Sequence, residues 1–178
     1  LTLSADNEGV GLFDMEMAAF QRLGGTVRYE SAVTGLIQTD GKVTGVYVGD
    51  EQIMADAVIL ASGGFEASDE KRVKHIGPHW ARAKVRGTPM NTGDGLVMAT
   101  AVGAQEYGLF GGCHATPMDL HMADFGNLDL PHGERKNYRK ICYFLGVMLN
   151  ARGERFVDEG INFRNYTYAQ FGRAVLVQ

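Results

Sequence analysis

Two polar side chains stand at the start of helical patterns, where charged groups can do chemistry. Asp94 lies in the stretch TGDG directly before an apolar helical pattern, so its carboxylate and the adjacent backbone amides can bind hydroxyls or anions. A simpler interpretation is a helix cap formed by Thr92 or Asp94. Arg164 follows Glu159 by five residues, near the start of a second amphipathic pattern. A lone arginine at such a place is most often a surface residue, so a catalytic role and a surface position both stay open for Arg164.

A loop-rich stretch from Gly108 to Arg139 holds three of the five histidines. Its side chains that could ligate a metal are Cys113, His114, Asp119, His121 and Asp124. Their spacing matches no known zinc pattern. We therefore expect no metal site.

The stretch AVILASGGFE, residues 57–66, has four apolar residues that lead into small ones. This pattern predicts a buried strand that ends at Ser62 and Gly63, against a ligand too close for larger side chains. A plain strand-to-helix turn is the alternative. The G-x-G-x-x-G loop that usually begins a dinucleotide site is absent from the sequence before this strand.

The elements that would position these residues follow from periodicity and turn signals. Residues 10–23 predict a helix that ends at a glycine pair, and residues 26–40, 42–48 and 51–55 predict strands joined by an Asp40-Gly41 turn. With the buried strand they form an α/β unit that carries a small β-meander. After residue 68 the pattern predicts a charged surface helix, a helix after TGDG, a strand pair within 141–150 and a final helix from residue 163. A second, α+β domain is thus predicted to begin near residue 68.

Composition narrows the class of protein. Hydrophobic residues make up 45% of the 178-residue chain and charged residues 21%, as in ordinary soluble globular proteins. A net charge of −4 gives no reason to expect nucleic acid or an anionic membrane as a partner. No apolar run approaches the roughly 20 residues that span a bilayer, and the first residues do not resemble a secretory leader. The two cysteines are expected to be reduced thiols, and the cytoplasm is the expected location.

The order of the motifs adds a resemblance. Five features occur in this order: LASGGF, TGDGLVMATAVGA, the histidine loop, VMLNARGERFVDE and a following arginine. Together they make the chain resemble the fumarate reductase and succinate dehydrogenase flavoprotein family. Within it, GCHATPMD and NARGERFVDEGINFRNYTYAQFGR look most like the tricarballylate dehydrogenase subgroup. The resemblance implies FAD as cofactor and the oxidation of tricarballylate to cis-aconitate. It also implies an internal fragment, with the middle part of an FAD-binding α/β domain at residues 1–67 and an α+β capping domain at residues 68–178.

Residue roles carry over from the family by position. Val33 would meet the adenine through its backbone, and Ala61, Ser62 and Gly63 would line the ADP half of FAD. Asp94 would face the flavin side. The resemblance implies that His114 binds a substrate carboxylate, and that Arg164 binds substrate and donates or accepts the proton.

One departure from the family leaves alternatives open. NYRKICYF stands where fumarate reductases have a Thr-Glu pair, which puts a glutamate proton relay in doubt and favours a more anionic substrate. A fumarate reductase, a 3-ketosteroid dehydrogenase and a non-catalytic binding domain remain alternatives. The resemblance implies a small carboxylate as substrate and is compatible with an electron-transfer protein as a partner.

Overall fold

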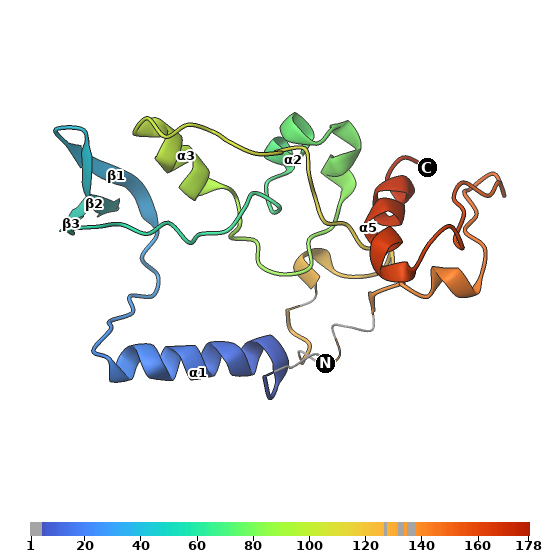
Figure 1. The fold of residues 1–178 in the computed structure, drawn as a ribbon, viewed down its shortest axis with the longest axis horizontal. Helices are drawn as coiled ribbons and strands as arrows, with labels where there is room; N and C mark the ends of the chain where they lie inside the picture. Colours follow the sequence, from blue (N-terminus) through green and yellow to red (C-terminus); the bar gives the residue numbers. More distant parts are fainter. Residues whose placement is uncertain (1–4, 127, 132–133, 135–137) are drawn as a thin grey trace.

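The structure of the protein is a computed structural model that describes residues 5–126, 128–131, 134 and 138–178. It combines helices with one small antiparallel sheet (Figure 1). Its elements are α1 (Glu8–Arg22), β1 (Val33–Thr39), β2 (Lys42–Val48), β3 (Glu51–Met54), α2 (Asp69–His75), η1 (Pro78–Arg82), α3 (Asp94–Ala101), η2 (Asp124–Gly126), η4 (Tyr143–Leu145) and α5 (Arg164–Val175).

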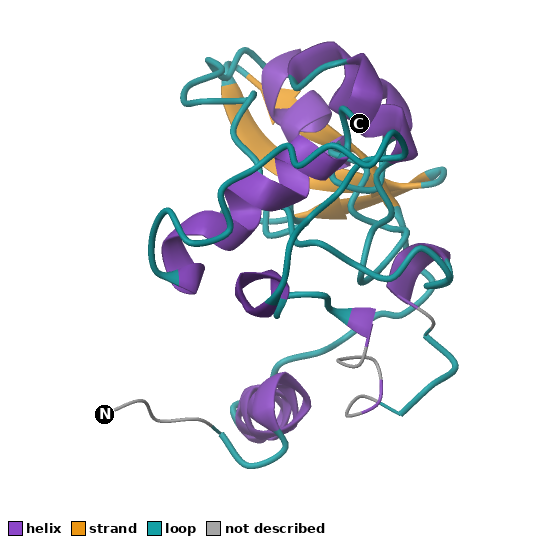
Figure 2. Ribbon diagram, turned by 90° about the vertical axis from the view of Figure 1, so that its right-hand side faces the viewer, coloured by secondary structure: helices purple, strands orange, loops and turns teal. Residues whose placement is uncertain are grey.

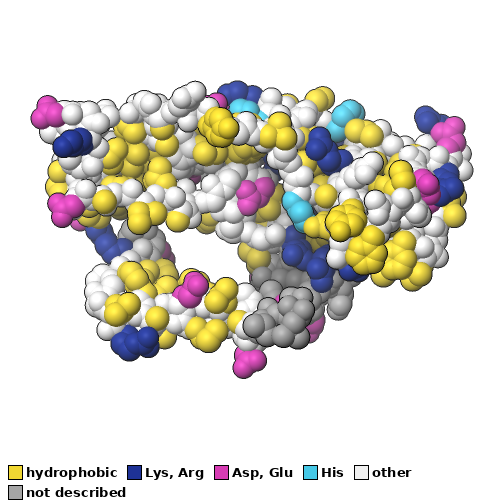
Figure 3. All heavy atoms as spheres, viewed as in Figure 1, with side chains coloured by type: hydrophobic (Ala, Val, Ile, Leu, Met, Phe, Trp, Pro, Cys, Tyr) yellow, Lys and Arg dark blue, Asp and Glu magenta, His cyan; other side chains and the backbone are white. Residues whose placement is uncertain are grey.

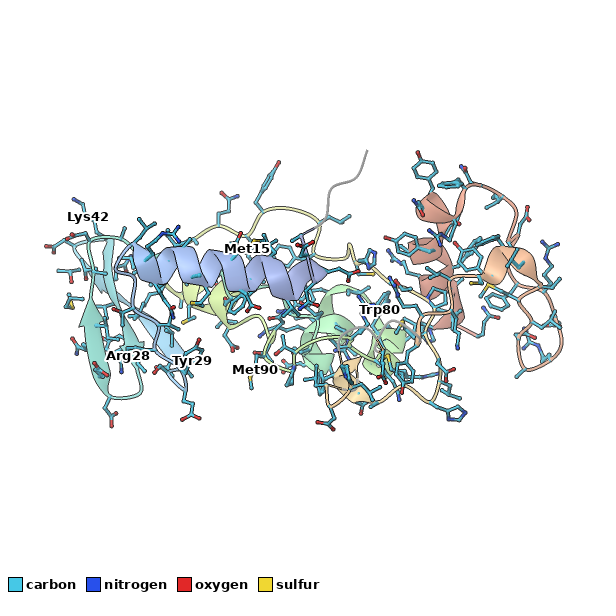
Figure 4. All side chains as sticks on the ribbon, turned by 90° about the horizontal axis from the view of Figure 1, so that it is seen from below. Met15, Arg28, Tyr29, Lys42, Trp80 and Met90 are labelled. Carbon is cyan, nitrogen blue, oxygen red and sulfur yellow. The ribbon has the colours of Figure 1, made fainter. Side chains whose placement is uncertain are left out.

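Helix α1 confirms the first predicted helix and ends at the predicted place. The backbone amide of Gly24 bonds back to the carbonyl of Gln21, and Gly24 has a φ of 85°, which suits a glycine just after a helix. No residue of α1 is buried. Its apolar side chains lie on the surface (Figure 3), among them Phe13 and Met15, each 56% exposed (Figure 4). This helix therefore gains little stability from packing within the described part of the chain.

The three strands form the predicted meander in the order β1-β2-β3. Asp40 and Gly41, with φ of 48° and 78°, make the tight turn between β1 and β2. The strand predicted over residues 26–40 is shorter in the structure, where β1 begins at Val33, opposite Val48. The side-chain amide of Gln38 donates to the carbonyl of Val102 at 3.2 Å, so the end of α3 lies against this sheet.

The prediction of a buried strand over residues 57–62 is wrong. These residues form an irregular trace that leads from β3 toward α2 (Figure 1), and Ile59 is 89% exposed. A strand needs a hydrogen-bonded neighbour, and β3 pairs only with β2. Among the described residues, the backbone of residues 57–64 makes no hydrogen bond to another backbone group. The apolar pattern is present, but no sheet edge in the described chain pairs with it.

A buried arginine organises the predicted surface helix, α2. Arg72 is only 5% exposed, and its guanidinium donates to the carbonyls of Glu66, Trp80 and Ala83 and to the carboxylate of Asp69. One side chain thus joins the segment before α2, the helix itself and η1. Such a cluster is stable because the buried charge is paired and its donors are used.

Helix α5 confirms the predicted final helix, whereas the strand pair predicted within residues 141–150 is wrong. Tyr143 lies instead in η4, where its ring packs edge-on against Phe171 at 4.9 Å and its hydroxyl lies 2.8 Å from that of Thr167. Those two contacts direct the Tyr143 ring at α5 from a short helical turn. Figure 2 shows the strands together in the one small sheet, with helices and loops elsewhere.

Two further expectations can be compared with the structure. Cys113 and Cys142 are both free thiols, as expected. No helix within the described residues is both long and apolar enough to cross a membrane. The boundary near residue 68 remains a prediction.

Candidate functional site

The glycine-rich segment and the TGDG segment lie against each other. An added Cβ on Gly95 would sit 2.2 Å from the hydroxyl oxygen of Ser62, and one on Gly63 would sit 2.9 Å from the side chain of Asn91. Gly63 also has a φ of 78°, which L side chains rarely adopt. The backbone conformation therefore favours glycine at position 63, and a side chain at position 95 would displace the Ser62 hydroxyl.

Hydrogen bonds hold the same two segments together. The amide of Ala67 donates to the carbonyl of Asn91 at 2.9 Å, and the side-chain amide of Asn91 donates to the carboxylate of Glu66 at 2.6 Å. The ammonium of Lys71 donates to the carbonyl of Thr92 at 2.5 Å. The loop before α3 is thereby fixed against the residues that follow Gly64.

Asp94 is the first residue of α3, and its side chain is exposed. The alternative of a side-chain cap from Thr92 or Asp94 is wrong, because the N-cap is Gly93, with a φ of 82° and no side-chain hydrogen bond. The Thr92 hydroxyl donates to the Asp94 carboxylate at 2.7 Å instead. The carboxylate is thus oriented by a neighbour while its remaining lone pairs face solvent.

The structure brings together only some of the predicted cofactor residues. Ser62, Gly63 and Asp94 belong to the joined segments, and Ala61 directly precedes them. Val33 lies at the start of β1, where it stands opposite Val48 on β2. Backbone amides without a backbone partner among the described residues, glycines that allow close approach and an oriented carboxylate fit a dinucleotide that must pack against the main chain.

His114 contacts the helix that begins with Arg164. The Nε2 atom of His114 lies 2.5 Å from the hydroxyl of Tyr168, and the two rings pack edge-on with centroids 5.0 Å apart. Tyr168 follows Arg164 by one helical turn, so the two side chains share a face of α5. His114 is therefore held beside the helix face that carries Arg164.

Arg164 occupies an unfavourable place for a cation. It is the first residue of α5, where the helix dipole disfavours positive charge. Among the described residues, its guanidinium donates only to the neutral side-chain oxygen of Asn165, from Nε at 3.3 Å and from an Nη atom at 3.2 Å. No carboxylate among the described residues forms an ion pair with it.

The loop that carries His114 is seated closely on α5. An added Cβ on Gly172 would lie 2.8 Å from the carbonyl carbon of Ala115 and 2.9 Å from the amide nitrogen of Thr116. Phe171 beside it is 2% exposed. At the same end, the Arg173 guanidinium lies 5.9 Å from the ring centroid of Trp80 on η1 (Figure 4). The histidine is thus positioned by packing of its neighbours.

Glu159 anchors the turn that precedes α5. Its side chain is 4% exposed; it accepts from the backbone amide of Met148 and forms an ion pair with Arg155 at 2.6 Å. The Met148 amide, then the residue's own amide and the Arg155 guanidinium, lower the pKa of Glu159, while burial acts in the opposite direction. Glu159 is therefore a buried and paired charge, unlike its exposed neighbour Asp158.

The lowered pKa of Glu159 predicts a pH-dependent contribution to stability. A carboxyl whose folded pKa lies below its unfolded value of about 4.3 stabilises fully above that value and loses the contribution as pH falls through the folded pKa. We expect Glu159→Gln to lower the melting temperature at pH 7, and the difference from wild type to shrink below about pH 4. Asp158→Asn is the matched control, since Asp158 contacts the same arginine with a carboxylate that is 63% exposed. A Glu159→Gln difference that does not change with pH would contradict the assignment.

Two other features do not belong to this site. A cavity of about 230 Å³ is lined by residues that include Arg72, Lys84 and Asp124, and by none of the predicted site residues. Within the part of the chain that the structure describes, no three His, Cys, Asp or Glu side chains are placed to hold a metal ion. His132, in the predicted histidine loop, lies outside the described residues.

Sequence reasoning missed Tyr168 and the buried state of Glu159. The spacing of Tyr168, four residues after Arg164, was a usable signal, because residues four apart share a helix face. Nothing in the spacing of Glu159 distinguishes it from its exposed neighbour Asp158. Only the three-dimensional approach of Met148 shows the difference.

The chain is similar to known proteins in sequence and in fold. The sequence pattern of the family described as FAD binding domain matches residues 4–178. A vinyl phenol reductase of Lactiplantibacillus plantarum (strain ATCC BAA-793 / NCIMB 8826 / WCFS1) is 32% identical over 162 residues, which are 83% of this chain and 30% of the reductase.

Two solved structures share the fold. A flavocytochrome c3 fumarate reductase in its open conformation aligns with a TM-score of 0.63 at 24% identity, over 88% of this chain and 26% of its own. A 3-ketosteroid-Δ4-(5α)-dehydrogenase from Rhodococcus jostii RHA1 aligns with a TM-score of 0.65 at 22% identity, over 95% and 31%. The chain spans less than a third of the length of each of these three proteins. Because the family pattern covers nearly every residue, the chain belongs to the FAD-binding domain family, and FAD is its cofactor.

Proposed function

We propose that the protein is an FAD-dependent oxidoreductase that acts on a CH–CH bond of a di- or tricarboxylic acid, with tricarballylate oxidised to cis-aconitate. The observation that carries the proposal is the contact of His114 with Tyr168, which stands one helical turn after Arg164 on α5. A histidine beside this helix and an arginine without an ion pair among the described residues offer directed, charge-assisted donors to carboxylates. Since the chain spans less than a third of its relatives, the activity of the whole protein is a proposal.

The residues that would hold FAD lie on the joined glycine segments. Ala61, Ser62 and Gly63 would line the ADP half, Asp94 would face the flavin side, and Val33 would meet the adenine through its backbone. When bound, FAD supplies a hydride acceptor. The support for this arrangement is the close approach of Gly95 to Ser62 and the backbone of residues 57–64, which has no backbone hydrogen bond within the described part of the chain.

The protein's own residues would handle binding and the proton. His114 would hold one carboxylate of the substrate, and Arg164 would accept the proton from the carbon next to the one that loses hydride. A free arginine side chain carries its proton in water at neutral pH, so an arginine can accept a proton only after it has passed its own proton to another group.

Lys140, in the basic stretch NYRKICYF, contributes less to the proposed carboxylate site than its charge suggests. Lys140 forms an ion pair with Asp119 at 3.0 Å, and its backbone amide donates to Pro117 at 2.8 Å. Its charge is therefore already balanced within the protein. The preference for an anionic substrate rests on His114 and Arg164.

Anaerobic flavin reduction tests the proposal against its alternatives. The full-length protein with bound FAD is mixed separately with tricarballylate, succinate and 4-androstene-3,17-dione, and flavin absorbance is followed. We expect tricarballylate to reduce the flavin fastest, succinate more slowly and the steroid not at all. Reduction by the steroid alone would contradict a carboxylate substrate and favour a steroid dehydrogenase. Faster flavin reduction by succinate than by tricarballylate would support oxidation of a CH–CH bond in a carboxylic acid and would reject the tricarboxylic acid as the preferred substrate.

A further inference from the structure

The Nε2 atom of His114 is already engaged within the protein. It lies 2.5 Å from the hydroxyl of Tyr168, and the edge-on packing of the two rings, inclined by 65°, restrains rotation of the imidazole. Only two ring nitrogens exist, so Nδ1 is the one left for a ligand. His114 itself is exposed, whereas Tyr168 is half-buried, so the tyrosine is the more fixed of the two.

We infer that Tyr168 is a positioning residue that makes His114 present Nδ1–H to a substrate carboxylate. A carboxylate only accepts hydrogen bonds, so the nitrogen that faces it must carry a proton. In the neutral ring this requires Nε2 to accept, and the Tyr168 hydroxyl is its donor. In the charged ring Nε2–H donates to the same hydroxyl oxygen, and Nδ1–H again faces outward. Both protonation states thus give the same orientation.

The placement of Tyr168 on α5 links this role to Arg164. Residues one turn apart on a helix are separated by about 5–6 Å between their Cβ atoms. Tyr168 therefore holds the histidine at a fixed offset from the arginine along the helix. Two donors at a fixed offset select acids whose carboxylate lies at a matching distance from the reacting carbon. The inference rests on the proposed function, since it assigns a role within the same carboxylate site.

The first test reads the proton directly and needs no turnover. In the full-length protein with ¹⁵N-labelled histidine, NMR of the neutral His114 ring is expected to show the proton on Nδ1, and Tyr168→Phe is expected to release that preference. Tyr166→Phe is the matched control, because Tyr166 lies on the same helix and is 77% exposed. A neutral wild-type ring protonated on Nε2, or an unchanged ring in Tyr168→Phe, would overturn the inference.

The second test compares kinetics with tricarballylate. Tyr168→Phe is expected to raise KM about fivefold to tenfold, the effect of one lost hydrogen bond, with kcat changed much less. His114→Asn, whose amide nitrogen stands near the position of Nδ1, should keep more substrate binding than His114→Gln, whose amide reaches the position of Nε2. Equal losses in both variants, or a glutamine variant that binds better, would contradict the inference.

The two tests separate this inference from the proposed function. An Nδ1-protonated ring whose signal shifts on addition of tricarballylate supports both. A ring with the expected proton that responds to neither tricarballylate nor succinate supports the positioning by Tyr168 and counts against the carboxylate site. The wrong tautomer with normal turnover rejects only the role of Tyr168.

Discussion

Lysine in place of Arg164 is expected to leave FAD bound and to slow tricarballylate-dependent flavin reduction by about 10³-fold or more, within the range of lost general acid–base catalysis. The lysine keeps the positive charge but loses the planar fork and part of the reach. Substrate should still bind through His114, so the flavin should stay oxidised in a formed complex. Anaerobic stopped-flow measurement of flavin absorbance in the full-length protein follows this step directly.

Arg173→Lys is the matched control for this prediction. Arg173 lies at the other end of α5, with its guanidinium over the Trp80 ring, and takes no part in the proposed site. The control should reduce its flavin at nearly the wild-type rate. An Arg164→Lys protein that also does so would exclude Arg164 as the proton-transfer group and leave it as a half-buried residue at the start of α5.

Local signals in the sequence were enough for the helices and the meander. The Asp40-Gly41 pair correctly marked the turn between β1 and β2, and the glycines after residue 23 correctly marked the end of α1. Both depend on backbone conformations that a few residue types adopt, so neighbouring residues suffice to predict them. Strand pairing is different, because it depends on a partner that can lie anywhere in the chain.

The apolar segment at residues 57–62 shows the limit. Its composition is that of a buried strand, but no sheet edge in the described chain pairs with it, and Ile59 is left 89% exposed. The failure within residues 141–150 has the opposite cause, since a specific partner, α5, draws the Tyr143 ring into a short helical turn. In both cases tertiary context overrides local propensity.

The candidate site also combines residues that local motifs predict with contacts that depend on the fold. Sequence motifs indicate Ser62, Gly63 and Asp94 as candidate site residues, and the structure joins the segments that carry them. The sequence does not predict the contact between His114 and Tyr168, because the two residues lie 54 positions apart. Contacts between a loop and a helix face require the fold. Val33 was assigned by family position alone, and its role stays a prediction.

The second large effect is expected at Asp94. Asp94→Asn should weaken FAD binding by about 10-fold to 100-fold, because a hydrogen bond to a charged group contributes roughly 1.5–3 kcal/mol. Asparagine keeps a side-chain oxygen that can accept from the Thr92 hydroxyl, and Asp94 does not cap α3, so the fold should change little. Equilibrium titration of the apoprotein with FAD measures the affinity, and thermal melting of the apoprotein measures the fold.

Thr92→Val separates the carboxylate from its local contact. This variant removes the 2.7 Å hydrogen bond to Asp94 but leaves the charge in place. Because the carboxylate would lose an orienting contact and keep its acceptor atoms, we expect a smaller loss of FAD affinity than in Asp94→Asn. Equal losses in the two variants would show that loop structure, not the carboxylate, supports FAD binding. Unchanged FAD affinity in Asp94→Asn together with a lowered melting temperature would reduce Asp94 to a residue that stabilises the start of α3.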